Sequence, residues 1–494
     1  MTSEVTLPVW SVVLFGLFAA IGLLDRLLIP SVRWAMRRRA NRAIEELNTR
    51  LKLQIQPFKL TRRQVLIDRL LYDPEVLSAV ESYSRETGAP REVAMTRAQG
   101  YAREIVPSFS AYTYFKVGTR LARRISQGLY RVRLGYTSNE AMAAIDPNSA
   151  VVFVINHRSN MDYVLVTYLA STSSALSYAV GEWAQVWGLR SLIRSMGAYF
   201  IRRDSRDALY RRVLSRYVQM ATAAGVTQAM FPEGGLTRDG ALRGPKLGLR
   251  SYMVSSFDPK GERDVVFIPV GLNYDRVLED RIQIAAATTP AGERPRFKFN
   301  PFVLTGFLLK SLGQRLAGRW HRYGYACVSF GAPVSLKTYL ANRGLDFRTL
   351  PPDIRTAEIE RLGTRLMTEV GQVVPALPVP LVASVMLAAG NEALTEFEVK
   401  GRVYDLMRTL ERKGAYVHIP RADRNYAIDL GLKALAERHM IEDTNGTYRA
   451  NPEQHALLTY YANSIAHLID PVGAGAPAGA GTATPAPQVR PEAP

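Results

Sequence analysis

Cysteine is almost absent from this chain, which has one, Cys327, in 494 residues. A single cysteine excludes a framework of disulfide bonds, and no cluster of Cys and His has the spacing of a metal site. Such a composition is typical of a reducing compartment. We therefore expect no bound metal and no zinc chemistry.

Acidic residues are also in short supply, since 63 Lys and Arg stand against 44 Asp and Glu and give a formal net charge of +19. A chain this basic should attract polyanions, such as anionic lipid headgroups, phosphorylated metabolites, coenzyme A, acidic carrier proteins or nucleic acid. Zinc-finger, RNP and helix-turn-helix signatures are missing, so we do not expect nucleic acid as a partner. Hydrophobic residues make up 47% of the chain, which is enough for a large packed core.

Long uncharged apolar runs are few, and the first covers residues 7–24. It is at the short end of what spans a bilayer, which takes about 20 residues. Before it the only charged side chain is that of Glu4, whereas behind it come Arg33, Arg37, Arg38, Arg39 and Arg42. The positive-inside rule then predicts an uncleaved N-terminal anchor, with the rest of the chain at the cytoplasmic face of the cell membrane. The alternative is a monotopic or hairpin insertion, because residues 25–30 suit the membrane interface.

A second uncharged run covers residues 370–391 and is interrupted by Pro375, Pro378 and Pro380. Proline breaks helices and removes hydrogen-bond donors, so we do not expect a lipid-exposed span there. We interpret the run as a buried linker followed by a core helix over residues 381–389.

Composition and hydrophobic periodicity divide the chain into five regions. These are a membrane anchor with its basic flank (residues 1–45), a helical domain (46–145), an α/β domain (146–370), a mostly helical C-terminal domain (371–470) and a disordered tail rich in Gly, Ala and Pro (471–494). Short strands alternate with helices in the α/β domain, which predicts a mostly parallel sheet flanked by helices. Residues 302–325 have the pattern of a basic amphipathic helix, either on the membrane surface or with an ordinary solvated face.

The most informative stretch is His-Arg-Ser-Asn-Met-Asp, from His157 to Asp162, which connects a strand pattern over residues 150–155 to a helical pattern. The carboxylate of Asp162, in the first helical turn, can fold back onto one ring nitrogen of His157. The other nitrogen is then free to take a proton from an alcohol, as a general base does. The alternative is a satisfied structural histidine at the end of a strand.

Two more blocks place polar groups after strand-like segments. Residues 197–203 (Gly-Ala-Tyr-Phe-Ile-Arg-Arg) predict a short strand that ends at Arg202 and Arg203. Residues 231–238 (Phe-Pro-Glu-Gly-Gly-Leu-Thr-Arg) follow another strand pattern and contain Glu233, Gly234, Gly235 and Arg238. Ligands bind beyond the carboxyl ends of parallel strands, so we expect these groups near His157. The guanidiniums suit a phosphate dianion, and the Gly-Gly turn lets backbone N–H groups approach it while the carboxylate of Glu233 positions an arginine.

With a fourth block at residues 265–271 (Val-Val-Phe-Ile-Pro-Val-Gly), these segments resemble the four ordered blocks of the glycerolipid acyltransferases. The resemblance is closest to the bacterial and mitochondrial type of glycerol-3-phosphate acyltransferase. The blocks of that type are similar to His-Arg-Ser-x-Met-Asp, Gly-Ala-x-Phe-Ile-Arg-Arg, Glu-Gly-Gly-x-Ser/Thr-Arg and Ile-Pro-Val-x-Ile/Leu-x-Tyr. Flanking segments at residues 70–76, 328–334 and 458–467 extend the resemblance over about residues 65–470.

The resemblance implies the glycerolipid acyltransferase fold and a membrane-associated enzyme. Its reaction would move a fatty acyl group from acyl-CoA or acyl-carrier protein to the sn-1 hydroxyl of glycerol 3-phosphate, without a cofactor. His157, Asp162 and Glu233 are the candidate catalytic residues, and contact with the glycerol phosphate carries over to Arg202 and Arg238. A Gly-x-Ser-x-Gly elbow and a second cysteine are missing, which favours direct transfer over an acyl-enzyme.

The third block departs from the family pattern at Leu236, where the relatives have Arg after Glu-Gly-Gly. Pro232 makes the same block similar to that of the lysophosphatidate acyltransferases. The phosphate contact would then come from Arg238, Arg243 or Lys246. Lysophosphatidate and dihydroxyacetone phosphate are therefore alternative acceptors, and a basic membrane scaffold without activity is the alternative of a different class.

Overall fold

The computed structural model describes residues 55–170, 175–181, 189–202, 205–246, 248–289 and 323–469. These residues belong to one compact unit that begins at Ile55. Four predictions concern residues outside this set: the anchor at residues 7–24, most of the amphipathic segment at residues 302–325, the position of Arg203, and the C-terminal tail.

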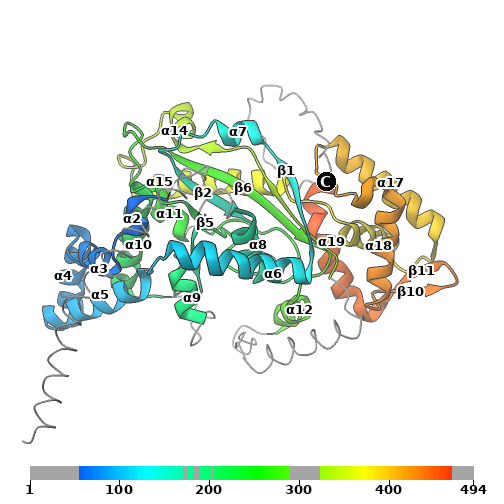
Figure 1. Ribbon diagram of the computed structural model, residues 1–494, viewed down its shortest axis with the longest axis horizontal. Helices are drawn as coiled ribbons and strands as arrows, with labels where there is room; N and C mark the ends of the chain where they lie inside the picture. Colours follow the sequence, from blue (N-terminus) through cyan, green and yellow to red (C-terminus); the bar gives the residue numbers. More distant parts are fainter. Residues whose placement is uncertain are drawn as a thin grey trace, which may run out of the picture. The chain divides into compact units, whose positions relative to one another are not determined.

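A mixed sheet forms the centre of the unit, in the order β1-β7-β6-β2-β5-β3-β4, with β8 paired to β6 (Figure 1). Its strands are β1 (Arg131–Thr137), β2 (Ala150–Ile155), β3 (Ser177–Val180), β4 (Tyr199–Phe200), β5 (Gln228–Met230), β6 (Val265–Tyr274), β7 (Tyr325–Phe330) and β8 (Val334–Ser335). The strands from β6 to β4 in this order are parallel, whereas β7 and β8 are antiparallel to β6. The prediction of a mostly parallel sheet with helices is confirmed.

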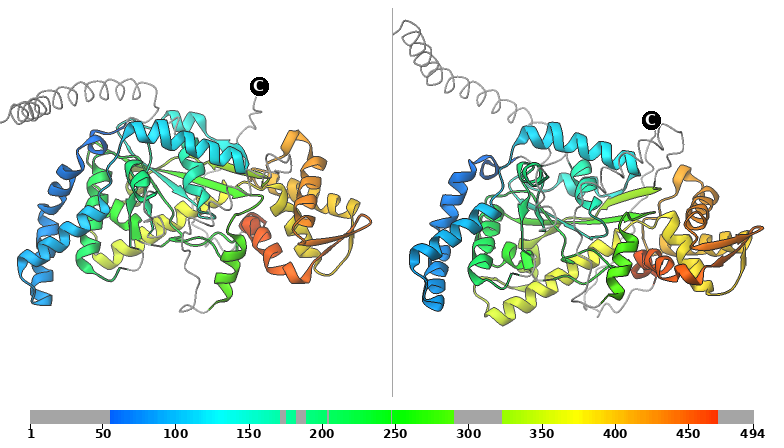
Figure 2. Two further views of the ribbon diagram at one scale, coloured as in Figure 1. Left: turned by 60° about the horizontal axis from the view of Figure 1, so that its bottom comes forward. Right: turned by 90° about the horizontal axis from the view of Figure 1, so that it is seen from below.

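Helices cover both faces of this sheet. Figure 2 shows α6 (Thr119–Leu129) on one side of the sheet and α15 (Pro352–Gln372) on the opposite side. Every residue of β2 and β6 is buried, as expected for strands packed on both faces, and this explains their continuous apolar sequences. The other helices of this part are α7 (Asn139–Ala143), α8 (Met161–Ala170), α9 (Leu189–Ser195), α10 (Ala208–Ala223), α11 (Gly248–Val254), α12 (Asp280–Thr288) and α14 (Leu336–Arg343).

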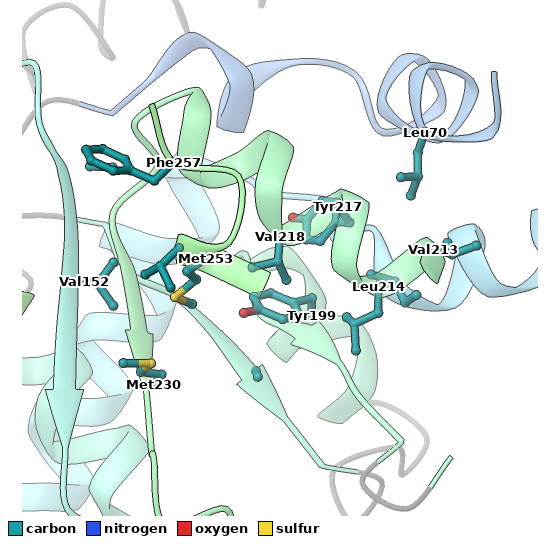
Figure 3. Close-up of a cluster of buried hydrophobic side chains, with 14 of the residues drawn as sticks. Leu70, Val152, Tyr199, Val213, Leu214, Tyr217, Val218, Met230, Met253 and Phe257 are labelled. Atoms are coloured by element: carbon teal, nitrogen blue, oxygen red, sulfur yellow. The ribbon is translucent and has the colours of Figure 1, made fainter. Parts of the chain in front are cut away.

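The N-terminal helices share their hydrophobic core with the sheet. They are α2 (Pro57–Leu60), α3 (Arg63–Leu71), α4 (Pro74–Thr87), α5 (Arg91–Ile105) and the π-helix η1 (Thr113–Gly118). One buried cluster joins Leu70 of α3 with Val213 and Tyr217 of α10 and with Val152 of β2 (Figure 3). Each such side chain contributes about 1.5–3 kcal/mol when it is fully buried.

One strand departs from the predicted regions, because β1 lies inside the range expected to be helical. Its partner is β7, with Arg131 opposite Tyr325, so the contact that makes it a strand comes from a segment far along the chain.

The starts of helices were more predictable than this strand. As expected, the carboxylate of Asp73 caps α4 by accepting from the backbone N–H of Glu75, and Pro74 is the first helical residue.

The C-terminal part is mostly helical but contains a small antiparallel sheet that we did not predict. Its helices are α16 (Pro378–Ala389), α17 (Glu396–Arg412), α18 (Arg424–Ala436), α19 (His455–Ile469) and the short η3 (Pro420–Ala422) and η4 (Pro452–Gln454). The small sheet has the order β10 (Ile441–Thr444), β11 (Thr447–Ala450) and β9 (Leu394–Thr395). The predicted core helix of the second uncharged run is α16, which is largely buried. The expected capping box of α17 forms between Thr395 and Glu398.

Among the residues that the structure describes, no helix has both the length and the apolar character needed to cross a membrane.

Candidate active site

Three neighbouring strands bring the candidate catalytic residues together. β2 lies between β5 and β6, and their carboxyl ends lead to His157, Glu233 and Tyr274. The chain leaves β2 toward β3 on one side and later returns to form β6 on the other, so the order of the strands reverses at β2. Such a reversal is where open α/β sheets bind their ligands.

The carboxylate of Asp162 fixes the ring of His157. The Nδ1 atom of His157 lies 2.9 Å from Oδ2 of Asp162, and both side chains are almost fully buried. Because an ionised carboxylate only accepts hydrogen bonds, Nδ1 carries the hydrogen and the neutral ring keeps a lone pair on Nε2. The same Oδ2 also accepts from the backbone N–H groups of Arg158 and Ser159, at 2.7 and 3.0 Å. The predicted pairing is therefore present.

Tyr274 forms a hydrogen bond with the second oxygen of this carboxylate. Its hydroxyl donates to Oδ1 of Asp162 at 2.7 Å. We did not predict this contact, although Tyr274 matches the final Tyr of the family's fourth block. The hydroxyl is fully buried, and burial raises the pKa of Tyr274 well above its usual value, so it stays a hydrogen-bond donor at neutral pH.

Glu233 supports the histidine from the other side. Its Oε1 accepts from the backbone N–H of His157 at 2.8 Å, and its Oε2 accepts from the backbone N–H of Arg243 at 3.1 Å. Burial raises the pKa of Glu233 to about 7 and outweighs these two hydrogen bonds and the charge of Arg158, all of which lower it. The carboxylate thus binds backbone groups, where we had expected it to position an arginine side chain.

The turn after Glu233 requires glycine. Gly234 has a φ of 70°, and its N–H donates to the carbonyl of Phe231 at 3.0 Å. A Cβ at this position would also come within 2.8 Å of Cδ of Lys246, so the lysine side chain lies directly against the turn. Gly235 follows in the chain, and Lys246 is exposed.

Aromatic rings cover the histidine. The ring of Phe231 is tilted by 33° to that of His157 with centroids 4.2 Å apart, and Tyr163 meets the histidine edge-on at 5.5 Å. These rings keep bulk water away from the base, which strengthens its electrostatic contact with Asp162.

Glu279 holds the loop between His157 and Asp162 in place. It accepts hydrogen bonds from the hydroxyl of Ser159 at 2.7 Å and from the side-chain amide of Asn160 at 3.1 Å. Burial raises the pKa of Glu279, and the hydrogen bonds from Ser159 and Asn160 oppose this. Glu279 comes shortly after the fourth block in the chain. Its hydrogen bonds therefore connect the segment after the fourth block to the first block, in addition to the pairing of β2 with β6.

Helix α19, near the C-terminus, also binds the active-site loops. Tyr460 donates to Oε1 of Gln283 at 2.6 Å, and the amide nitrogen of Gln283 donates to the carbonyl of Arg158 at 3.0 Å. The guanidinium of Arg158 lies 5.9 Å from the ring centroid of Tyr460 and donates to the carbonyl of Gly240 at 3.0 Å. The C-terminal segment that matched the family pattern therefore supports the first and third blocks.

A second set of contacts fixes α19 itself. The hydroxyl of Tyr461 donates to Asp280 and accepts from the backbone N–H of Val277 at 3.0 Å. Arg438 forms a buried ion pair with Asp280 at 2.8 Å. Asn463 donates to the carbonyl of Asp239, in the loop of the third block, at 2.9 Å. Loss of this helix would release three loops of the site.

Arg202 of the second block lies away from the histidine. Arg202 follows β4, which is three strands away from β2, a separation of about 14 Å at about 4.8 Å per strand. Its guanidinium forms a bidentate pair with Glu104 of α5 and lies over the rings of Tyr101 and Tyr210. Arg203 is outside the described residues, and Arg238 lies partly exposed in the loop of the third block. The roles of Arg202, Arg203 and Arg238 in substrate binding stay predictions.

Within the described ranges, no group of three or more His, Cys, Asp or Glu side chains is placed to hold a metal ion.

Comparison with known proteins agrees with this geometry. Residues 136–273 match the acyltransferase family, and residues 311–472 match the glycerol-3-phosphate acyltransferase C-terminal region. The chain belongs to the glycerol-3-phosphate acyltransferase family. The first match contains His157, Asp162 and Glu233, and the second contains α19, so the contacts between α19 and the site join the two matched regions.

Several members of this family are similar over most of the chain. The glycerol-3-phosphate acyltransferases of Pseudomonas savastanoi pv. phaseolicola and Aeromonas hydrophila are both 28% identical to it, over 83% of this chain and 49% and 50% of theirs. That of Pseudomonas fluorescens is 30% identical over 83% of this chain and 49% of its own length. The chain thus spans about half the length of the curated relatives it matches.

Among solved structures, the 1-acyl-sn-glycerophosphate acyltransferase from Thermotoga maritima aligns with 52% of this chain and 79% of its own, at 16% identity and a TM-score of 0.28. A similarity this low supports no argument about the site.

Proposed function

We propose that this chain is a glycerol-3-phosphate 1-O-acyltransferase, which transfers a fatty acyl group from acyl-CoA or acyl-carrier protein to the sn-1 hydroxyl of glycerol 3-phosphate. The observation that carries the proposal is the buried pair of His157 and Asp162 at the carboxyl end of β2, beside Glu233. The chain is similar to enzymes that are named for this activity, and the proposed substrate class comes from this similarity.

The geometry supports direct transfer. Nε2 of His157 takes the proton from the substrate hydroxyl as the oxygen attacks the carbonyl carbon of the thioester. The tetrahedral oxyanion collapses, the carbon–sulfur bond breaks, and the departing thiolate receives the proton from His157. Asp162 keeps the ring oriented and stabilises the imidazolium between the two steps. The thioester already carries the activated acyl group, so the proposed reaction uses no cofactor.

The acceptor phosphate would bind beside the third block. Lys246 lies against the turn at Gly234, and Arg243 and Arg238 belong to the same loop. Charge-assisted hydrogen bonds from such cations are the ordinary way to hold a phosphate dianion. In this arrangement Lys246 supplies a cation beside the turn, although position 236 is Leu and not Arg.

We further propose that the reaction takes place at the cytoplasmic face of the cell membrane, on an anionic surface. Residues 7–24 would anchor the chain, since they are uncharged and are followed by a cluster of arginines. A membrane location suits the chemistry, because the product carries a long acyl chain that partitions into lipid.

The proposal is tested by offering three acceptors in parallel with one acyl thioester. Glycerol 3-phosphate, 1-acylglycerol 3-phosphate and dihydroxyacetone phosphate would each be supplied to the wild type and to His157→Ala, with acyl-CoA and acyl-carrier protein as alternative donors. We expect His157-dependent acylation of glycerol 3-phosphate. The block Phe231-Pro232-Glu233 and Leu236 favour the lysophosphatidate acceptor as the second candidate, and preference for it would overturn the proposed acceptor while leaving the reaction class intact.

A further inference from the structure

The outer side of one long helical segment combines cations with exposed apolar side chains. η1 and α6 are continuous from Thr113 to Leu129, because the residues at their junction all have helical backbone angles. Figure 2 shows α6 along the outside of the unit. Three exposed side chains of this segment and of the residue just before it are apolar or aromatic: Tyr112 is 71% exposed, and Val117 and Leu121 are each 43% exposed. We call this surface, together with the exposed cations Lys116, Arg120, Arg123 and Arg124, the basic-apolar face.

The exposed residues share one side of the helix. Val117 and Leu121 are four positions apart, as are Arg120 and Arg124, and such residues are neighbours on a helix surface. The residues that alternate with them, Tyr114, Gly118, Ala122 and Ser126, are buried. Val117 and Leu121 are therefore exposed on the side of the helix that also carries the cations.

None of the acidic side chains that the structure describes neutralises the cations of this face. No acidic residue occurs in the sequence between Glu104 and Glu140. Within the part of the chain that the structure describes, Lys116, Arg120, Arg123 and Arg124 form no ion pair. Exposed arginines elsewhere do so, for example Arg212 of α10, which pairs with Glu75 at 3.1 Å.

We propose that the basic-apolar face docks on the surface of an anionic lipid bilayer. A helix that lies in the membrane interface places apolar and aromatic side chains among the acyl chains and keeps its cations at the negatively charged headgroups. A soluble acidic partner would satisfy the cations, but Tyr112, Val117 and Leu121 are spread along more than two turns and suit an extended apolar phase better. The inference rests on the proposed function in taking the membrane as the place of the reaction, and it identifies which face contacts the lipid.

The position of this face fits the site. The segment ends at Leu129, and the ring of the next residue, Tyr130, lies 5.3 Å from the ring of Tyr274. The hydroxyl of Tyr274 in turn contacts Asp162. Docking through η1 and α6 would therefore bring the catalytic pair close to the bilayer that takes up the acylated product.

The single cysteine allows a direct test in the full chain. Cys327 is completely buried, so an environment-sensitive thiol fluorophore should report only on an introduced cysteine. The test positions are Val117→Cys and Leu121→Cys. The matched controls are Val93→Cys and Phe397→Cys, which are 55% and 86% exposed but stand beside Glu92 and Glu396, respectively.

We expect vesicles that contain phosphatidylglycerol to shift the emission of the probe to shorter wavelength at positions 117 and 121 and not at the two control positions. Vesicles of phosphatidylcholine alone should shift it several-fold less. The combined change Arg120→Gln, Arg123→Gln and Arg124→Gln should reduce the shift at position 117 to that lower level.

Three results would overturn the proposal: equal shifts at all four positions, no shift at positions 117 and 121 while the protein floats with the vesicles, or a shift with an acidic acyl-carrier protein and none with lipid. The last result would assign the face to a protein partner. Acylation of glycerol 3-phosphate measured in detergent on the same labelled proteins tests the proposed function separately, because it does not require docking on a bilayer.

Discussion

The hydroxyl of Tyr274 and the ring of His157 bind opposite oxygens of one carboxylate, that of Asp162, at 2.7 and 2.9 Å. With both oxygens engaged, the carboxylate has one orientation, and so has the histidine ring. Tyr274 is separated from Asp162 by 112 positions in the chain, and the pairing of β6 with β2 brings them together.

We predict that Tyr274→Phe lowers kcat by about tenfold or more, because a hydrogen bond to a charged group contributes about 1.5–3 kcal/mol. KM should change little, since the hydroxyl of Tyr274 is buried against Asp162 and acts through the orientation of the base. Tyr130→Phe is the matched control: its ring is also buried and packs on Tyr274, but its hydroxyl donates to the carbonyl of Arg276. Equal losses in the two variants would show that Tyr274 acts through packing alone.

Glu233 should make stability depend on pH. Its native pKa of about 7 is above the ordinary value of about 4.3, so the native state binds the proton more tightly than the unfolded state. The stabilisation from this proton is complete below the unfolded pKa and is lost as the pH rises through the native pKa.

Relative to Glu233→Gln, which cannot ionise, the wild type should therefore lose roughly 3 kcal/mol of unfolding free energy between pH 4 and pH 8. Chemical unfolding of both proteins in the same detergent, across this pH range, measures the difference. Other buried carboxyls such as Asp275 titrate in both proteins and cancel. A constant difference across the range would mean that folding does not raise the pKa of Glu233.

Helix α19 should control activity from outside the catalytic strands. Tyr460→Phe removes the hydroxyl that holds Gln283, and through it the carbonyl of Arg158 next to the base. We expect kcat to fall about five- to tenfold, the equivalent of about 1 kcal/mol for one hydrogen bond. Thr459→Val is the control, because the hydroxyl of Thr459 contacts the ring of His455 on the exposed side of the same helix. If both variants keep full activity, the helix supports folding and not the site.

Binding of the acceptor phosphate should depend on Lys246 more than on Arg202. Lys246 lies against the Gly234 turn, whereas Arg202 is engaged by Glu104 three strands away from the base. Lys246→Ala should raise the KM for glycerol 3-phosphate by tenfold or more, in line with about 1.5–3 kcal/mol for a charge-assisted contact. Arg202→Ala should change the KM for glycerol 3-phosphate by no more than about twofold. The KM for the acyl donor should be similar in the two variants. The reverse order would place the acceptor phosphate beside Arg202 of the second block, one of the two positions onto which the family resemblance carries this contact.

The parts of the site that were predictable are local in sequence. His157 and Asp162 are five positions apart at a strand-to-helix turn, so their pairing follows from the backbone path. Glu233 was found because it follows a strand pattern and is followed by two glycines. The caps of α4 and α17 were predictable for the same reason, since each is formed within four residues.

What could not be predicted depends on the order of strands. Sequence places Arg202 after a strand, as it does His157, but only the sheet shows that β3 and β5 separate the two strands. The same holds for β1, whose alternating pattern is short and whose partner β7 lies almost two hundred residues away. The contacts of Tyr460 with Gln283 cross a similar separation, so the role of α19 is visible only in three dimensions.

The most direct test of the proposed chemistry is the rate of acyl transfer to glycerol 3-phosphate by His157→Ala, with folding checked by circular dichroism. The control is His455→Ala, which removes an exposed histidine on α19. We expect His157→Ala to lose about 10²–10⁴-fold in rate, the contribution of a positioned general base, and His455→Ala to match the wild type. Turnover by His157→Ala within a few-fold of the wild type would contradict the assignment of His157 as the base.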